Sequence, residues 1–338
     1  MNNRESIEKR EYEFLSPLAC HAAESKGRQF DEEQCEYRTD FQRDRDRIVH
    51  SKAFRRLIHK TQVFLAPEGD HYRTRLTHTL EVQQIARTIA RILAYNEDLT
   101  EAIALGHDLG HTPFGHVGEK VLNKIHPGGF EHNVQSLRTV DIIEDTSRRR
   151  GLNLTYEVRD GILNHRGPVT PATLEGQIVK ISDRIAYINH DIDDAIRSGV
   201  LTFEQLPERE VSILGSTHAD RINNLIVDLC KNSEGKDTIS LSPEFAGSLD
   251  RLREFMFENV YSSKKVRGVS DLDKVERIIS SLYSYYMEHS NEIPGIYKQI
   301  EKEEGTAVAV KDLISGMTDR YALNLYEKLF VPQEWRQL

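Results

Sequence analysis

The stretch around which this chain is organised reads EAIALGHDLGHTPFGHVGE and spans residues 101–119. It begins with an apolar helical pattern, and His107 and Asp108 follow directly after it. An imidazole nitrogen beside a carboxylate suits a transition-type divalent ion. If the helix continues, His111 projects to the same side as His107 and Asp108. We therefore expect a metal or catalytic site here.

The second half of this stretch predicts a new helical segment. We expect Thr112 as its N-cap and Pro113 as its first helical residue, where a missing N–H costs nothing. The segment places His116 and Glu119 three residues apart. A carboxylate at that spacing can fix the tautomer of an imidazole and raise its basicity, as in a general acid or base. Burying so many ionisable groups unpaired is costly, so packing alone does not explain them.

The composition describes an ordinary soluble protein of 338 residues, with 38% hydrophobic and 29% charged residues. Neither a signal peptide nor a run of about 18 apolar residues is present, so we expect a cytoplasmic protein. Cys20, Cys35 and Cys230 are odd in number and unclustered. They predict neither a disulfide framework nor a structural zinc site.

The charge pattern points to a small anionic ligand. A net charge of −9 argues against a surface that binds nucleic acid as a whole. Residues 43–60 are nevertheless basic, and Arg73 and Arg75 follow them. The cations of this stretch are Arg43, Arg45, Arg47, Lys52, Arg55, Arg56 and Lys60. They suit a small polyanion, while a solvated helix face with i,i+4 ion pairs is the alternative reading.

Apolar residues recur at helical spacing along most of the chain, which predicts an all-α fold. Helices are expected at 41–65, 74–95, 98–106, 156–164 and 174–196, and again throughout 203–338. Loops are expected at 67–75, 126–132 and 165–173 because of their Gly, Pro and Asp residues. His132 lies where a loop meets the next helix, so we expect it to line a cleft.

Two further residues complete a candidate ligand set. His78 lies on the predicted helix 74–95, and Asp183 adjoins the apolar face of another predicted helix. An unpaired carboxylate there is expensive unless it meets a cation or a metal. With His107 and Asp108 they supply two imidazoles and two carboxylates from three helices. Such a set leaves positions open for water and a phosphate oxygen on a six-coordinate Mn, Fe or Mg ion.

The order of these residues resembles the H…HD…D pattern of HD-domain phosphohydrolases. Four segments are similar to the dGTP triphosphohydrolase (dGTPase-like) family: YRTDFQRDRDRIVHSKAFRRLIHKTQVF (37–64), RTRLTHTLEV (73–82), GHDLGHTPFGHVGE (106–119) and KISDRIAYINHDIDDA (180–195). The resemblance is looser beyond them. It implies an HD-domain helical bundle with additional C-terminal helices, built as a single unit 1–338 with its core at about 41–200 and a helical C-terminal part at about 201–338.

The resemblance implies hydrolysis of a deoxynucleoside triphosphate, of the dGTP type, to the deoxynucleoside and inorganic triphosphate. A divalent ion (Mn, Mg or Fe) held by the four ligands would act as a Lewis acid on the α-phosphate. His111 would contact that phosphate. His116 would protonate the departing 5′ oxygen, and Glu119 would orient His116.

The family pattern also implies substrate contacts. Arg75 and Arg184 would neutralise the triphosphate, as would Arg253 and Tyr261. Tyr187 and Asp191 match positions that contact the deoxyribose, and Gln62 is a candidate for a base or sugar contact. Members of the family are often oligomers, commonly hexamers, and several respond to nucleotides. We therefore expect a homo-oligomer without a membrane partner, and a dNTP or single-stranded DNA as effector.

Two alternatives remain from the sequence. The first is another HD phosphohydrolase, a nucleotide monophosphatase or phosphodiesterase. Alarmone hydrolases typically show HDxxED where this chain has HDLGH, and the GYP signature of cyclic-dinucleotide enzymes does not occur. The second is a nucleotide-binding or single-stranded-DNA-binding regulator without catalysis. The presence of His116 and Glu119 beside a full ligand set disfavours it.

Overall fold

The computed structural model describes residues 3–62, 73–145, 149–261 and 269–332. Within these ranges the regular structure is helical, and β-type pairing is limited to isolated bridges such as the one between Thr61 and Thr74. The predicted all-α class is therefore confirmed.

The first half of the chain supplies the helices that carry most of the predicted site. They are α1 (Arg4–Phe14), α2 (Asp40–Val49), α3 (Lys52–Arg56), α4 (Arg75–Ile92), α5 (Glu97–Gly106), α6 (Gly115–Ile125), α7 (His132–Arg138), α8 (Tyr156–Asn164) and α9 (Leu174–Arg197). Short 3₁₀ turns occur at Ala22–Glu24 and Leu57–His59, and a π-helical turn at Thr139–Ile143 follows α7.

The second half continues as α10 (Glu208–Leu214), α11 (His218–Ser233), α12 (Pro243–Met256), α13 (Val269–Glu288), α14 (Gly295–Glu304), α15 (Thr306–Ser315) and α16 (Asp319–Phe330). Short 3₁₀ turns lie at Phe203–Gln205 and Ser290–Glu292, and a π-helical turn lies at Phe257–Tyr261. Among the described helices, none is both long enough and apolar enough to cross a membrane.

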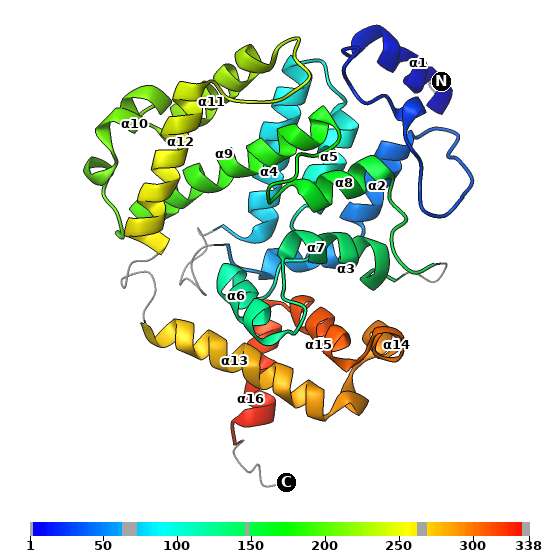
Figure 1. Ribbon diagram of the computed structural model, residues 1–338, viewed down its shortest axis with the longest axis vertical. Coiled ribbons are helices and arrows are strands. Elements are labelled where there is room, and N and C mark those ends of the chain that lie inside the picture. Colours follow the sequence, from blue (N-terminus) through cyan, green and yellow to red (C-terminus); the bar gives the residue numbers. More distant parts are fainter. Residues whose placement is uncertain (1–2, 63–72, 146–148, 262–268, 333–338) are drawn as a thin grey trace, which may run out of the picture.

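A first hydrophobic core forms where α4, α5 and α9 pack together (Figure 1). Ile85 on α4, Leu99 on α5 and Ile185 on α9 are almost fully buried there. The apolar stripe of each helix faces the other two, as the helical periodicity of the sequence requires. This first core fixes the ends of three helices relative to one another.

A second hydrophobic core contains α6 together with the C-terminal helices α13, α15 and α16. Leu122 on α6, Ile279 on α13 and Ile314 on α15 are fully buried in it. Figure 1 shows α6 beside α13, with α14 to α16 at the end of the molecule away from α10 to α12. Although α6 follows α5 closely in sequence, it packs with helices from the end of the chain.

The long predicted helices 74–95, 98–106 and 174–196 are confirmed by α4, α5 and α9. The single helix predicted at 41–65 is wrong, since α2 ends at Val49 and α3 begins at Lys52. Ser51 causes the restart because its hydroxyl accepts the backbone N–H of Phe54 at 3.0 Å. A side-chain cap of this kind favours a new helix start over continuation.

The predicted start of α6 is also wrong. This helix begins at Gly115, and Phe114 precedes it in the left-handed conformation (φ 61°, ψ 28°). The Thr112 hydroxyl donates to the carbonyl of Gly115 at 2.9 Å instead of accepting an amide. Since α5 ends at Gly106, His111 does not share a helix with His107. Most of the loop predicted at 67–75 lies outside the described residues.

Candidate active site

The four predicted ligand side chains converge in one place. His78 comes from α4 and Asp183 from α9, and His78 Nε2 lies 3.1 Å from Asp183 Oδ1. His107 and Asp108 arrive from the end of α5. His107 Nε2 lies 3.9 Å from Asp183 Oδ1 and 4.0 Å from Asp108 Oδ1. The first core therefore brings together groups that the sequence separates by more than a hundred residues.

The tautomer of His107 fits metal binding. His107 Nδ1 lies 2.6 Å from the carbonyl oxygen of Ala104, so this nitrogen carries the hydrogen and donates it. Its Nε2 then presents a lone pair, and this buried atom has no partner among the described residues. An unpartnered buried nitrogen is expensive unless a ligand meets it. His78, His107 and Asp108 lie close enough together to hold a divalent metal ion, and the Asp183 carboxylate lies beside both imidazoles.

Both carboxylates of this group are ionised at neutral pH. Burial raises the pKa of Asp108, but the Arg75 guanidinium and the neighbouring imidazoles lower it well below its usual range. Arg75 Nη1 donates to Asp108 Oδ2 at 2.6 Å. Burial likewise opposes ionisation of Asp183, but the hydrogen bond from His78 and the nearby His107 hold its pKa below the ordinary value. Ionised carboxylates are the form that binds a metal.

A second group surrounds Glu119 on α6. Glu119 Oε2 lies 3.0 Å from His116 Nδ1, and Glu119 Oε1 lies 2.9 Å from His132 Nδ1. The backbone N–H of His132 also donates to Oε1 at 3.1 Å. Burial would raise the pKa of Glu119, but the hydrogen bonds to both histidines hold it far below its usual range. His132, which we expected at the edge of a cleft, is a buried member of this group.

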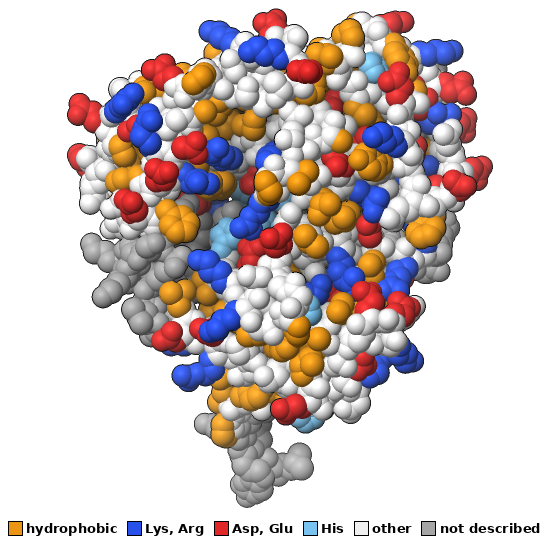
Figure 2. Space-filling model, viewed as in Figure 1, with side chains coloured by type: hydrophobic (Ala, Val, Ile, Leu, Met, Phe, Trp, Pro, Cys, Tyr) orange, Lys and Arg blue, Asp and Glu red, His pale blue; other side chains and the backbone are white. Residues whose placement is uncertain are grey.

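His116 is the most accessible member of the group. Its side chain is 62% exposed, whereas that of Glu119 is 9% exposed. Figure 2 shows histidine side chains in a hollow of the surface, with Lys and Arg side chains near it. Desolvation by the surrounding protein and the Arg75 cation lower the pKa of His116 despite the opposing hydrogen bond to Glu119. With Nδ1 engaged by Glu119, Nε2 is free to face a bound molecule.

His111 adjoins this group and lies close to the charged pair Arg75–Asp108. Its ring stacks on that of His132 at a centroid distance of 4.6 Å and lies 5.1 Å from that of His116. Burial and the Arg75 charge lower the pKa of His111 well below its ordinary value, so the ring is neutral. Neither of its nitrogens, nor Nη2 of Arg75, has a partner among the described residues. The Arg75 Nη2 group and the one N–H that the neutral His111 ring carries are buried donors, and such donors indicate an oxyanion ligand.

Two of the predicted sugar-contacting residues lie on α9. Asp191 is buried, and Tyr187 is half-buried. Burial and the nearby Asp183 carboxylate raise the pKa of the Tyr187 phenol, so it is a neutral hydrogen-bonding group. Gln62 lies next to the start of α6, because its carbonyl oxygen would be 3.1 Å from a Cβ added to Gly115.

The remaining predicted cations lie farther out. Arg184 on α9 forms an ion pair with Asp250 on α12. Arg253, also on α12, is exposed and hydrogen-bonds the Tyr187 side chain. The side chain of Tyr261 lies outside the described residues. Arg75 and His132 thus lie within the site, whereas Arg184 and Arg253 lie farther from it, on α9 and α12.

His165 and Arg166 also belong to the group around Glu119, although no sequence pattern singled them out. His165 Nδ1 lies 2.7 Å from the carbonyl of Ile162, and its Nε2 lies 3.3 Å from His132 Nε2. Burial lowers the pKa of His165 to about 3, so it is neutral. Arg166 Nη1 donates to Glu119 Oε1 at 3.0 Å. The available signal was position, since His165 follows directly after α8 as His107 follows α5.

Known families and proteins match this chain along most of its length. Residues 75–188 match the HD domain and residues 239–328 the phosphohydrolase-associated domain. A deoxyguanosinetriphosphate triphosphohydrolase-like protein of Caldanaerobacter subterraneus subsp. tengcongensis is 56% identical, covering 99% of this chain and 98% of that protein. Proteins of the same name from Desulfatibacillum aliphaticivorans and Clostridium perfringens are 50% and 48% identical, each covering 98% of this chain and 99% of that protein. Among solved structures, a hypothetical protein from Aquifex aeolicus covers 85% of this chain and 71% of its own, with 20% identity and a TM-score of 0.45.

The His/Asp cluster and the HD-domain match define the class: this chain is an HD-domain phosphohydrolase. The relatives that share about half of their residues with this chain, over nearly its whole length, identify the family within this class. The chain belongs to the deoxyguanosinetriphosphate triphosphohydrolase-like family.

Proposed function

We propose that this protein is a metal-dependent hydrolase that converts a deoxynucleoside triphosphate, of the dGTP type, into the deoxynucleoside and inorganic triphosphate. One observation supports this above others: His111 lies between the metal-type ligands and the His116–Glu119 pair, and its buried nitrogens have no partner among the described residues. The names of the relatives, which are triphosphohydrolase-like, agree with the proposal.

The metal would be held by His78, His107, Asp108 and Asp183. When bound, a Mn, Mg or Fe ion supplies Lewis acidity at the α-phosphate and orients the attacking water. The protein contributes three ligands that are already in the form that binds a metal, since both carboxylates are ionised and His107 presents a lone pair. Because these groups are already in place, the site needs little reorganisation when substrate binds.

The α-phosphate would be received by Arg75 and His111. Nη2 of Arg75 is buried and has no partner in the part of the chain that the structure describes, while Nη1 donates to Asp108, so the guanidinium can donate to an oxyanion without losing that contact. Arg184 and Arg253 would meet the outer phosphates from the α9–α12 side. Arg253 is exposed, whereas Arg184 is partly buried and would have to leave its ion pair with Asp250 to reach a polyphosphate.

His116 would act as the general acid. Water attacks the α-phosphorus and releases one proton to solvent, the bond between phosphorus and the 5′ oxygen breaks, and the Nε2 proton of the His116 imidazolium moves to that oxygen. Solvent then returns a proton to His116. Glu119 stays ionised because its pKa lies far below the usual range, so it orients the ring and favours the imidazolium that precedes transfer. His132 and Arg166 hold Glu119 in place through its other oxygen.

The sugar would lie against α9. Tyr187 and Asp191 face the same side of this helix as Asp183, four and eight residues along. A phenol packed against the 2′ carbon would exclude a ribose hydroxyl, and Asp191 would accept a hydrogen bond from the 3′ hydroxyl. Gln62 would contact the base or sugar from the start of α6.

Chromatographic analysis of products tests the proposal. The Mn-loaded protein is incubated with each dNTP and with GTP, alone and in mixtures. We expect deoxynucleoside and triphosphate from dNTPs, and little turnover of GTP. Monophosphate and pyrophosphate would contradict the position of His116 at the 5′ oxygen. Greater turnover in mixtures would support the proposed nucleotide effector, and sedimentation of the same samples would test the proposed homo-oligomer.

A further inference from the structure

The loop 107–114 joins the metal-type group to α6, and its last residue has an uncommon backbone. Phe114 is in the left-handed region, and Gly115 follows at φ 57°. A bulky residue rarely adopts this conformation without contacts that hold it. A Cβ on Gly115 would crowd the carbonyl of Gln62 at 3.1 Å, so the start of α6 is also tightly enclosed. This turn sets the direction in which α6 leaves the loop.

The side chain that holds this turn comes from the far end of the chain. Asp319 Oδ1 accepts the backbone N–H of Phe114 at 2.9 Å. Its Oδ2 accepts the backbone N–H of Thr61 at 3.0 Å and the Thr61 hydroxyl at 2.7 Å. Asp319 is buried, with 8% exposure. Three hydrogen bonds to one carboxylate form a strong and directional clamp.

The clamp does not serve the helix on which it lies. Asp319 is the first residue of α16, but Thr318 is its N-cap, with a hydroxyl that accepts the N–H of Tyr321 at 3.2 Å. The Asp319 carboxylate is instead directed to backbone groups more than two hundred positions earlier. A capping role therefore does not explain it.

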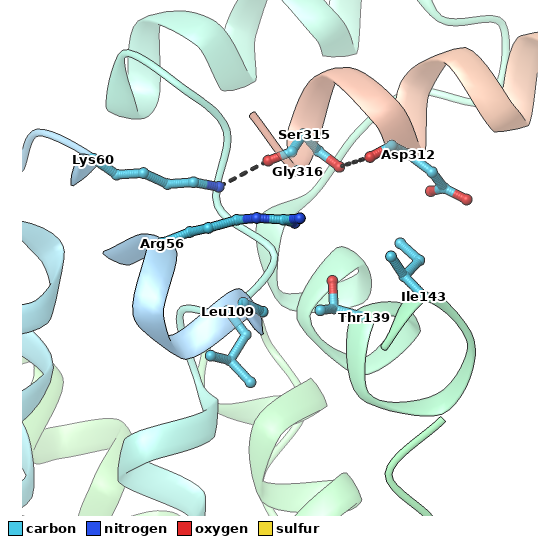
Figure 3. Close-up of a pocket in the computed structure, with 9 residues that line it drawn as sticks. Arg56, Lys60, Leu109, Thr139, Ile143, Asp312, Ser315 and Gly316 are labelled. Carbon is cyan, nitrogen blue, oxygen red and sulfur yellow. Dashed lines mark hydrogen bonds between the residues drawn. The ribbon is translucent and has the colours of Figure 1, made fainter. Parts of the chain in front are cut away.

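A second contact supports the same loop beside the first. Lys60 is buried, and its ammonium donates to the carbonyl of His111 and, at 2.8 Å, to that of Ser315 at the end of α15. Figure 3 shows Lys60 reaching Ser315 next to Arg56, at a small cavity that Asp312 and Gly316 also line. The turn between α15 and α16 thus meets the loop at both His111 and Phe114.

We propose that Asp319 is a positioning residue for the hydrolytic reaction: its carboxylate fixes the Phe114 turn and so sets where α6 presents His116 and Glu119. The inference rests on the proposed function, because it assigns His116 to the reaction. It extends the active site beyond the HD-domain match, since Asp319 lies in the matched phosphohydrolase-associated domain. A displacement of His116 by about 1 Å is enough to cost on the order of a hundredfold in rate.

The first test compares three variants of the whole protein. Asp319→Ala should lower kcat by about 10- to 100-fold, with KM and bound metal little changed, because only the acid moves. Asp319→Asn keeps one acceptor oxygen and should recover part of the loss. Asp220→Ala is the matched control, since Asp220 also lies in the first turn of a helix and accepts a threonine hydroxyl, at 2.7 Å, but is exposed and belongs to α11. It should leave kcat unchanged.

The second test separates positioning from general damage. In the His116→Ala background, Asp319→Ala should lower the residual rate by less than about threefold, since positioning acts through the missing imidazole. A full additional loss in that background would overturn the proposal. Thr61→Val removes one of the three donors and should give a smaller loss than Asp319→Ala while retaining the fold.

The rate of amide hydrogen exchange reports on the order of the Phe114 turn and does not depend on an activity assay. Peptides that cover residues 107–125 should exchange faster in Asp319→Ala than in wild type, and should match wild type in Asp220→Ala. Unchanged exchange in Asp319→Ala would overturn the positioning proposal whatever the reaction. If wild type hydrolyses no nucleotide while exchange responds as expected, the proposed function fails and the clamp stands.

Discussion

The two halves of the site rest on different cores. His78, His107 and Asp183 are anchored by α4, α5 and α9, which pack in the first core. His116 and Glu119 lie on α6, whose apolar face packs with α13, α15 and α16 in the second core. The metal-type half and the acid half are therefore separately supported and meet through the loop 107–114. The effects of substitutions in one half can therefore be compared with the effects of substitutions in the other.

The halves also differ in charge and access. The metal-type half sets two ionised carboxylates against buried imidazoles, and its side chains are nearly closed to solvent apart from Asp183, at 24% exposure. The acid half sets one carboxylate among imidazoles, and His116 is 62% exposed. Fixed ligands benefit from enclosure, whereas a proton donor must reach its substrate. The difference in exposure matches the roles that we propose.

Removal of a ligand should have the largest effect. Asp183→Ala should abolish turnover and lower the bound metal measured by elemental analysis, because it deletes one of two carboxylates from the ligand set. Asp193→Ala on the same helix is the control, since Asp193 pairs with Arg73 outside the ligand set. Unchanged metal content in Asp183→Ala would remove Asp183 from the set.

Removal of the acid should come next. His116→Ala should lower turnover of a deoxynucleoside triphosphate by about 10²- to 10⁴-fold, the usual contribution of general acid catalysis, with metal content unchanged. His126→Ala at the end of α6 is the control, because its ring lies 3.2 Å from Tyr283 Oη and outside the acid group. Full activity of His116→Ala, measured in steady-state assays, would exclude His116 as the acid.

Matched substitutions in the two cores should separate their roles. Leu99→Ala in the first core and Leu122→Ala in the second each remove a fully buried side chain and should each cost about 2–5 kcal/mol of stability in denaturant titrations. Where both variants remain folded, Leu99→Ala should weaken metal binding and Leu122→Ala should lower kcat with metal retained. The same pattern in both variants would mean that the halves are not separately supported.

Lys60, at the junction of the halves, should make the stability of the protein depend on pH. Burial lowers the pKa of Lys60 from 10.5 to about 7 in the folded protein. Between these values only the unfolded chain holds the proton, so stability should rise with pH in wild type relative to Lys60→Met. The difference should grow by at most about 1.4 kcal/mol per pH unit and flatten below pH 7. Parallel stability curves for the two proteins from pH 7 to 10 would contradict this pKa.

The sequence predicted the long helices because apolar periodicity is visible within each segment. It pointed to His78, His107, Asp108 and Asp183 because they follow the H…HD…D order along the chain. It placed the start of α6 incorrectly, since Phe114 is held in the left-handed region by a carboxylate from Asp319. No local pattern reveals a partner so distant. His165 was missed for a similar reason, because its nearness to His132 depends on the packing of α7 on α8.

A substrate with sulfur in place of the 5′ bridging oxygen tests whether one half binds the metal and the other protonates the leaving group. A thiolate leaves without protonation, because thiols are far more acidic than alcohols. His116→Ala should therefore hydrolyse a 5′-thio-deoxynucleoside triphosphate at close to the wild-type rate, while Asp183→Ala should remain inactive on it. An equal loss for His116→Ala on the oxygen and sulfur substrates would contradict His116 as the acid at the 5′ position.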